Sequence, residues 1–341
     1  IKNHDDVKKY LKIKTLGVVP HNSIDYETGK KNKNYTMPRS NVYLKIINEP
    51  NSVISESIRM IRTNLNFMDL KVVNVTSTLP SEGKTETLTN TAVSFAMLGK
   101  RVLVMDCDLR KPKVHRSFGL NRKEGITDVI LSKGTKNYKE VVQTFDTGVH
   151  DVKIDLLSAG SKISNPSELV NSKRFALLVE EVKKDYDLVL IDCPPISVMA
   201  DGIIVSKLCD GTIYVIEADR TDYQVVSSCI EQLQNNKAFV LGAILTKVNV
   251  KQQKKLYGYK YNYYYWGYTQ TTKSREKYID IHCHLINEVD DGAKNLEQSL
   301  RELIIAHRIG LKKIICTSHI CHGQNDRLNK IKTNFDILKE Y

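Results

Sequence analysis

Short apolar runs alternate with amphipathic segments through the middle of the chain. These runs predict strands at residues 72–75, 101–106, 151–158, 187–192, 211–217 and 239–246, and the runs at 101–106 and 187–192 are apolar enough to indicate burial on both faces. Apolar residues that recur every three to four positions predict helices at residues 52–65, 88–98, 167–184, 200–209 and 222–234. Strands that alternate with helices indicate an α/β fold with a doubly wound, mostly parallel sheet.

The first twenty residues have a pattern of their own. A short helical pattern of Val7, Tyr10 and Leu11 precedes LKIKTLGVVP, which predicts a strand ending at Pro20. Residues 21–40 are then rich in Lys, Asn, Ser, Thr and Gly, a composition typical of a flexible linker. We therefore expect an N-terminal arm that is attached to a separate body beginning near Asn48.

Composition narrows the class of protein. The chain has 341 residues and a net charge of +12, but no recognised nucleic-acid-binding motif accompanies the charge, so we expect a solvated surface and no nucleic acid. The seven cysteines form no C-x-x-C pair, which favours buried thiols in a reducing cytoplasm. Without a long apolar run or a signal peptide, the chain is expected to be soluble. It begins without methionine, so we expect a fragment whose start, and any membrane anchor, is missing.

Residues 75–87, VTSTLPSEGKTET, have the pattern of a phosphate-binding loop. A strand, a loop and a helix would aim backbone N–H groups and the positive helix end at a triphosphate. Lys84 would reach the phosphates and the Thr85 hydroxyl could bind magnesium. The usual pattern has a glycine where Thr78 stands, so an ordinary glycine-containing turn is the alternative. The candidate nucleotide-binding residues are Pro80, Ser81, Glu82, Gly83, Lys84, Thr85 and Glu86.

Aspartates end two of the predicted strands. RVLVMD runs into D-C-D-L-R, which contains Asp106, Asp108 and Arg110, and DLVLID ends at Asp192. Open α/β sheets bind ligands at the carboxyl ends of their strands. Carboxylates there could hold magnesium and accept a proton from an attacking hydroxyl. The alternative is a strand-end turn, in which aspartate is common.

Three further patterns carry candidate functions. Glu56, Arg59 and Arg62 are spaced three apart on one helix face, which fits either a salt bridge or a subunit contact. Seven of the twelve residues at 257–268 are tyrosines, namely Tyr257, Tyr259, Tyr261, Tyr263, Tyr264, Tyr265 and Tyr268. They could be a low-complexity tail, a sticky aromatic edge or, beside a nucleotide site, acceptors of phosphate. His282 and His284 have metal-ligand spacing, although H-x-H alone is a weak signal.

Taken together, LPSEGKT, DCDLR followed by Lys111 and Pro112, LVLIDCPP and the tyrosine-rich segment resemble the bacterial tyrosine kinases (BY-kinases) of capsular and exopolysaccharide synthesis over residues 40–268. The resemblance implies a MinD/ParA-like P-loop fold and the cofactors ATP/ADP and Mg²⁺. It implies that Lys84, Asp106, Asp108, Asp192 and Arg110 are catalytic and that Thr85, Asp106 and Asp192 hold the metal. It also implies that the tyrosines accept phosphate, and it favours Glu56, Arg59 and Arg62 as contacts in a ring-shaped homo-oligomer.

The flanking segments resemble other proteins of the same system. Residues 1–29 resemble the cytoplasmic tail of the kinase's transmembrane adaptor, a polysaccharide co-polymerase, which would place the kinase at the cytoplasmic face of the membrane. Residues 278–341 resemble the start of a PHP-type tyrosine phosphatase, too short for phosphatase activity. The expected divisions are an adaptor arm at 1–29, a linker at 30–47, a kinase domain at 48–250, a tyrosine-rich tail at 251–277 and a truncated α/β extension at 278–341.

This organisation would suit an engineered fusion or a natural fusion cut short at its start. The implied partners are the adaptor, a cognate tyrosine phosphatase and sugar-metabolism enzymes as possible substrates. Two alternatives remain: a MinD/ParA-like regulatory ATPase without kinase activity, and a non-enzymatic scaffold. ATP hydrolysis without phosphotyrosine would favour the first, and a failure to bind ATP would favour the second.

Overall fold

The computed structural model describes residues 1–21, 44–149 and 151–249, and the backbone of two strands at 278–283 and 311–316. The chain divides into two compact units, Ile1–Gly258 and Tyr259–Tyr341. In the described part of the second unit, β9 (Tyr278–Cys283) pairs in parallel with β10 (Leu311–Cys316). The candidate chemistry that the structure describes lies in the first unit.

The first unit is built on an eight-stranded sheet with the order β1-β8-β7-β2-β6-β3-β5-β4. Its strands are β1 (Thr15–Pro20), β2 (Val72–Ser77), β3 (Val102–Asp106), β4 (Gln143–Asp146), β5 (Lys153–Leu157), β6 (Leu188–Asp192), β7 (Gly211–Glu217) and β8 (Val240–Val248). Every pairing is parallel except that of β4 with β5. This confirms the doubly wound, mostly parallel fold, while the short edge strand β4 went unpredicted.

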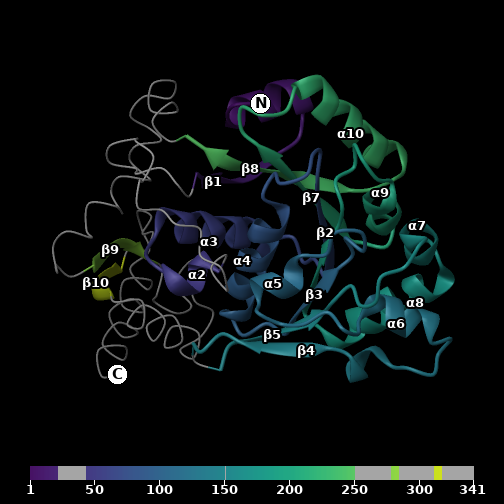
Figure 1. Ribbon diagram of the computed structural model, residues 1–341. Helices are drawn as coiled ribbons and strands as arrows, with labels where there is room; N and C mark the ends of the chain where they lie inside the picture. Colours follow the sequence, from purple (N-terminus) through teal and green to yellow (C-terminus); the bar gives the residue numbers. More distant parts are fainter. Residues whose placement is uncertain (22–43, 150, 250–277, 284–310, 317–341) are drawn as a thin grey trace, which may run out of the picture. The chain divides into compact units, whose positions relative to one another are not determined.

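Helices cover both faces of the sheet (Figure 1). The helical segments are α1 (His4–Asp6), η1 (Val7–Leu11), α2 (Lys45–Asn48), α3 (Val53–Asn66), α4 (Lys84–Ala96), α5 (Val114–Ser117), α6 (Ile126–Leu131), η2 (Tyr138–Glu140), α7 (Pro166–Val170), α8 (Lys173–Asp185), α9 (Asp201–Ser206) and α10 (Tyr223–Asn235). Alternate residues of β2 enter different cores: Val73 and Val75 pack with α3 and α4, whereas Val72 packs with α6, α8 and α9. Two buried faces explain why the strands read as unbroken apolar runs.

Two predicted boundaries are wrong. The helix expected at 167–184 is divided into α7 and α8, because Ser172 starts a new helix by accepting a hydrogen bond from the Phe175 N–H. The helix expected from residue 88 begins at Lys84, directly after the phosphate loop. The loop is therefore tighter than the sequence pattern indicated, and Lys84 lies in the first helical turn.

The expected separation of an N-terminal arm from the body is also wrong. Strand β1 pairs in parallel with β8, and the buried Leu16 belongs to the main core. Gly17 lies so close to α3 that a Cβ atom there would be 2.3 Å from the Ile61 Cγ1 atom. The first twenty residues are thus an edge of the same sheet. No helix in the described residues is both long enough and apolar enough to span a bilayer.

Candidate active site

The phosphate loop connects β2 to α4 at the carboxyl edge of the sheet. Strands β6 and β3 lie next to β2 in turn, so their ends bring Asp192 and Asp106 to the same edge. Gly83 precedes α4 with φ 92°, and a Cβ atom there would lie 3.3 Å from the Thr246 side chain. The strand, loop and helix expected from the sequence are therefore present, and the ends of β3 and β6 add the two aspartates.

Thr78, which replaces the usual first glycine of the loop, has a structural role. Its buried Oγ1 lies 2.8 Å from the buried hydroxyl of Tyr214 on β7. Its carbonyl accepts a hydrogen bond from the Ser197 hydroxyl. The side chain thus points into the protein and the backbone is tied to the loop after β6. A glycine would remove the first of these contacts, so the departure from the usual pattern belongs to this loop's own packing.

Lys84, Thr85 and Asp192 converge beneath the loop. The Thr85 hydroxyl donates to Asp192 Oδ2 at 2.7 Å, and Lys84 Nζ lies 3.7 Å from Asp192 Oδ1. Burial alone would lower the pKa of Lys84, but Asp192 and the neighbouring carboxylates of Asp108 and Asp106 outweigh it and raise the pKa. The lysine is therefore a buried cation at neutral pH, which is the property required of a phosphate-binding lysine.

Asp106 and Asp192 face each other across neighbouring strands, as paired residues of β3 and β6. Both are buried, and burial raises the pKa of each; for Asp106 the nearby Asp192 charge raises it further. Asp106 Oδ2 accepts from the Val114 N–H at 3.1 Å. The Oδ1 atom of Asp106 and the Oδ1 atom of Asp192 accept no hydrogen bond from the described residues. Two buried carboxylate oxygens without donors fit a cation that both residues would share.

Asp108 and Arg110 follow in the loop after β3. Asp108 is partly exposed and accepts from the Lys111 N–H at 3.1 Å. Arg110 points its Nε to Asp201 Oδ2 at 3.4 Å and its Nη2 to the Ser167 hydroxyl at 3.0 Å. Ser167 also donates to Asp201. Asp201 is buried at the start of α9 and was missed by sequence reasoning, which had only its helix-start position as a signal.

The remaining loop candidates differ in environment. Pro80 and Ser81 are exposed, whereas Glu82 is fully buried. Burial raises the pKa of Glu82, opposed by hydrogen bonds from the Leu79 N–H and the Thr221 hydroxyl. Burial also raises the pKa of Glu86, although Lys45 and Lys247 oppose the shift. The Glu82 side chain therefore supports the loop from inside the protein, through its hydrogen bonds with Leu79 and Thr221, and does not face a ligand.

The three charged residues of α3 have partners within their own chain. Arg59 pairs with Glu56 and donates to the Pro50 carbonyl at 2.7 Å. Arg62 donates to the Ser94 carbonyl of α4 at 3.1 Å. The salt bridge expected as one alternative is thus formed, and the subunit contact stays a prediction. The seven tyrosines at 257–268 and His284 lie outside the described residues, and His282 is described only by its backbone.

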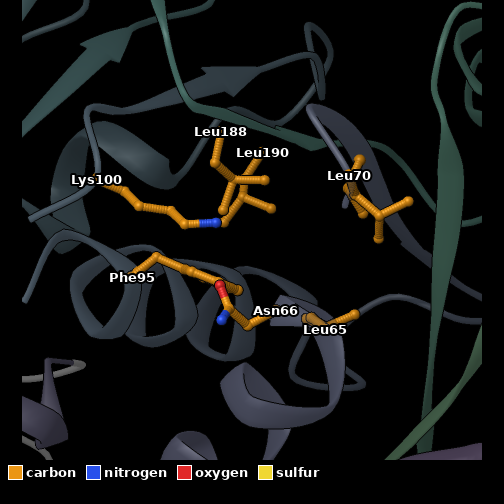
Figure 2. Close-up of a pocket in the computed structure, with 8 residues that line it drawn as sticks. Leu65, Asn66, Leu70, Phe95, Lys100, Leu188 and Leu190 are labelled. Carbon is orange, nitrogen blue, oxygen red and sulfur yellow. The ribbon is translucent and has the colours of Figure 1, made fainter. Parts of the chain in front are cut away.

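The structure has a small apolar cavity that none of the candidate site residues lines (Figure 2). It is lined by Leu65, Asn66, Leu70, Val73, Phe95, Lys100, Leu188 and Leu190. These residues come from the end of α3 and the loop before β2, the C-terminal part of α4 and the loop that follows it, and the strands β2 and β6. Its volume of ≈ 10 Å³ is about the least that one water molecule needs. The cavity belongs to helix packing and is far too small for a nucleotide.

Comparison with known proteins identifies the family. The family model of an AAA domain matches residues 70–244, the segment that holds the loop and both strand-end aspartates. The tyrosine-protein kinase YwqD of Bacillus subtilis (strain 168) is 37% identical over 240 residues, which are 69% of this chain and 98% of that protein. The chain belongs to the bacterial tyrosine kinases. The putative tyrosine-protein kinase CapB of Staphylococcus aureus is 32% identical over 63% of the kinase and 94% of CapB.

Solved structures and a second family model agree with this assignment. The crystal structure of the chimerical protein CapA2B2 superimposes with a TM-score of 0.62 and 28% identity, and covers 72% of the kinase and 99% of the chimera. The kinase domain of the Escherichia coli tyrosine kinase ETK shares the fold, with a TM-score of 0.63 and 24% identity. A family model described as capsular polysaccharide synthesis, CpsB/CapC, matches residues 278–341. The family favours a kinase over a regulatory ATPase or a scaffold.

Proposed function

We propose that this kinase transfers the γ-phosphoryl group of ATP to tyrosines in its own C-terminal cluster and thereby regulates capsular or exopolysaccharide synthesis. The observation that carries the proposal is the convergence of Lys84, Thr85, Asp192 and Asp106 at the end of three neighbouring strands. The tyrosine-rich segment provides acceptors in the same chain.

The roles of the residues follow from charge and position. ATP would lie over the loop with its phosphates toward the first turn of α4, where Lys84 would neutralise the charge that develops on the transferred group. Thr85, Asp192 and Asp106 would hold Mg²⁺, which when bound would offset phosphate charge. This set fits the ion because both aspartates have a buried oxygen that accepts no hydrogen bond from the residues that the structure describes.

The transfer step needs a proton acceptor. Asp106, in its ionised form, would take the proton of the attacking tyrosine hydroxyl as the new O–P bond forms and the bond from the γ-phosphorus to the bridging oxygen of ADP breaks. Burial and the neighbouring Asp192 charge raise the pKa of this carboxyl, so its ionised form binds a proton more readily, as a general base must. Asp108 would support the charge of Lys84, and Arg110, held by Asp201 and Ser167, would orient phosphate.

The assembly of the kinase is part of the proposal. We infer that Glu56, Arg59 and Arg62 contribute to contacts in a ring and that a tail reaches the active site of a neighbouring subunit. Residues 1–29 would represent the tail of a membrane adaptor, which fits the match to the chimerical CapA2B2. Each phosphate adds about −1.5 to −2 charges, so several of them would repel one another and favour disassembly.

The test compares three full-length proteins with ATP and Mg²⁺. Lys84→Met should abolish phosphotyrosine on a blot, and a variant with all seven tyrosines replaced by Phe should lose nearly all of it. Mass spectrometry of the wild type should place phosphate on residues 257–268. Undiminished labelling of Lys84→Met would disprove the assigned active site.

A mixing experiment tests transfer between chains. Lys84→Met keeps the acceptor tyrosines but lacks the phosphate-binding lysine. The seven-Phe variant keeps the lysine but lacks the acceptor tyrosines. Incubated together, they should produce phosphotyrosine on the Lys84→Met chain. Labelling of wild type at a rate independent of protein concentration, with none in the mixture, would show transfer within one chain.

A further inference from the structure

The phosphate loop contains a serine in an unfavourable backbone conformation. Ser81 has φ 67°, and it is exposed at the tip of the loop. A residue with a Cβ atom in this left-handed region costs about 1–3 kcal/mol and persists only where its surroundings hold it. Contacts with the rest of the protein must therefore maintain the loop in this shape.

Two consecutive residues at the end of β8 supply these contacts. The Thr246 hydroxyl donates to the Glu82 carbonyl at 2.6 Å, and Lys247 Nζ donates to the Ser81 carbonyl at 2.8 Å. Thr246 and Lys247 thus bind two successive carbonyl groups of the loop from the same strand end. The sequence gives no sign of this, because residues 81 and 247 are far apart along the chain.

The direction of these carbonyls sets the direction of the loop's N–H groups. In a planar trans peptide the C=O and N–H bonds point opposite ways. With the Ser81 carbonyl turned toward Lys247, the Glu82 N–H points away from β8. With the Glu82 carbonyl turned toward Thr246, the Gly83 N–H does the same. Phosphate binding at a helix N-terminus requires N–H groups, not carbonyl oxygens, to face the anion.

Lys247 is itself held in place by an ion pair with Glu217. Its Nζ lies 2.9 Å from Glu217 Oε2, and Arg220 Nη1 lies 2.7 Å from the same oxygen. Partial burial would raise the pKa of Glu217, but Lys247 and Arg220 outweigh it and lower the pKa. Glu217 therefore stays ionised at neutral pH and keeps the Lys247 ammonium beside the loop.

We propose that Lys247 is a positioning residue for nucleotide binding. By holding the Ser81 carbonyl on the outer side of the loop, it keeps the backbone N–H groups of the loop turned toward the phosphates before nucleotide arrives. Thr246 does the same for the next peptide group. The inference rests on the proposed nucleotide site and adds to it the residues that keep that site preformed.

The test measures the affinity of the full-length protein for ADP and for ATP by titration calorimetry, with KM and kcat from phosphotyrosine formation. If Lys247→Met leaves a tenth of the loops in the binding shape, both nucleotides should bind about tenfold more weakly. KM should rise by a similar factor, while kcat stays within about twofold, because bound nucleotide restores the loop. Lys247→Arg keeps a donor and should recover most of the affinity.

A matched control separates this role from general effects of losing a lysine. Lys237, just before β8, is exposed and has φ 64°, and Lys237→Met should bind both nucleotides like the wild type. Thr246→Val should weaken binding in the same direction as Lys247→Met. The two variants remove neighbouring contacts by different chemistry, so agreement between them supports the loop as the cause.

Three results would overturn the inference. Unchanged ADP affinity in Lys247→Met, with normal binding by wild type, would show that the loop needs no such support. A loss confined to ATP would mean that Lys247 contacts the γ-phosphate itself. A fall in kcat without a rise in KM would assign it to the transfer step. By contrast, a wild type that binds neither nucleotide would disprove the proposed function first.

Discussion

Aspartates border the central strands at both edges of the sheet, and the two edges use them differently. At the amino ends, Asp187 precedes β6 and Asp210 precedes β7; both are partly exposed, and each accepts hydrogen bonds from backbone N–H groups and pairs with a basic side chain. At the carboxyl ends, Asp106 and Asp192 are buried, and each keeps one oxygen that accepts no hydrogen bond from the described residues, although Lys84 Nζ lies 3.7 Å from that oxygen of Asp192. Among the described residues, both carboxylate oxygens accept hydrogen bonds in the aspartates at the amino ends, but only one does so in each aspartate at the carboxyl ends.

The pKa values of the aspartates also differ between the two edges: they are lowered at the amino edge and raised at the carboxyl edge. Hydrogen bonds from Arg101 lower the pKa of Asp187. Partial burial would raise the pKa of Asp210, but bonds from Lys183, Val72 and Lys71 outweigh it and lower the pKa. Burial raises the pKa of Asp106 and Asp192. Donors from the chain therefore stabilise the charged form of the aspartates at the amino edge, whereas burial disfavours the charged form of those at the carboxyl edge.

The largest expected effect comes from Asp192→Asn. Loss of this charge removes the partner of Lys84 and Thr85, and we expect kinase activity to fall about 10²–10³-fold. Asp187→Asn, at the other end of the same strand, is the matched control and should keep activity within about twofold. Phosphotyrosine formation at saturating ATP measures both. Equal losses in the two variants would remove the distinction between the edges.

Asp106→Asn should have the next largest effect. An amide cannot accept the tyrosine proton, and we expect kcat to fall about 10²-fold, with ADP affinity reduced much less. Calorimetry with ADP and steady-state kinetics would separate the two. If ADP binding fell as much as kcat, the loss would be explained by metal and nucleotide binding alone, and the role of Asp106 in proton transfer would be disproved.

Asp210→Ala should change stability and leave catalysis intact. The substitution removes hydrogen bonds to the Lys71 and Val72 N–H groups and the pair with Lys183. We expect a loss of about 2 kcal/mol in the free energy of unfolding, measured by urea denaturation, with unchanged KM and kcat. A tenfold loss of activity at unchanged stability would contradict the assignment of this edge to structure alone.

The smallest and most specific effect is a difference in pH dependence. The folded pKa of Asp210 is lowered, so its stabilising contribution is complete above about pH 4, the ordinary range for aspartate, and is lost as the pH falls through the folded value. The folded pKa of Asp106 is raised, so its buried charge destabilises the protein as the pH rises above about 4, and fully so above the folded value.

Urea denaturation between pH 3 and 8 should therefore give opposite trends. Asp106→Asn should be more stable than wild type at pH 8, and the difference should vanish in acid. Asp210→Ala should be less stable at pH 8, and its deficit should shrink as the pH falls below 4. Parallel curves for the two variants would show that the two edges do not differ in this way.

Much of the site could be read from the sequence because its residues follow short, local patterns. Lys84 and Thr85 stand at a loop-to-helix junction, and Asp106 and Asp192 end apolar strands, so their approximate places follow from the parallel sheet. The pairing of β3 with β6, which sets the two aspartates face to face, is not a local property. The contacts of Thr78 with Tyr214 and of Arg110 with Asp201 join residues about 90 to 140 positions apart.

The N-terminal strand was predicted correctly, but its separation from the body was the main error at the level of the fold. The linker-like composition of residues 21–40 suggested that whatever preceded it lies apart from the body. The exposed edge of β8 instead pairs with β1, since an edge strand has unpaired N–H and C=O groups that another strand can satisfy. Composition cannot report this, because pairing depends on which edge the rest of the sheet leaves free.

The sequence by itself determined the α/β class, the phosphate loop, the strand-end aspartates and the resemblance to bacterial tyrosine kinases, because each of these is written in contiguous residues. Only the tertiary structure decided that Thr246 and Lys247 hold the loop, that Glu82 supports it from inside, and that two buried carboxylates each keep an oxygen that accepts no hydrogen bond from the described residues. The physical reason is that burial, charge and hydrogen bonding depend on side chains that are far apart in the sequence. The order of the strands in the sheet determines which of these side chains come into contact.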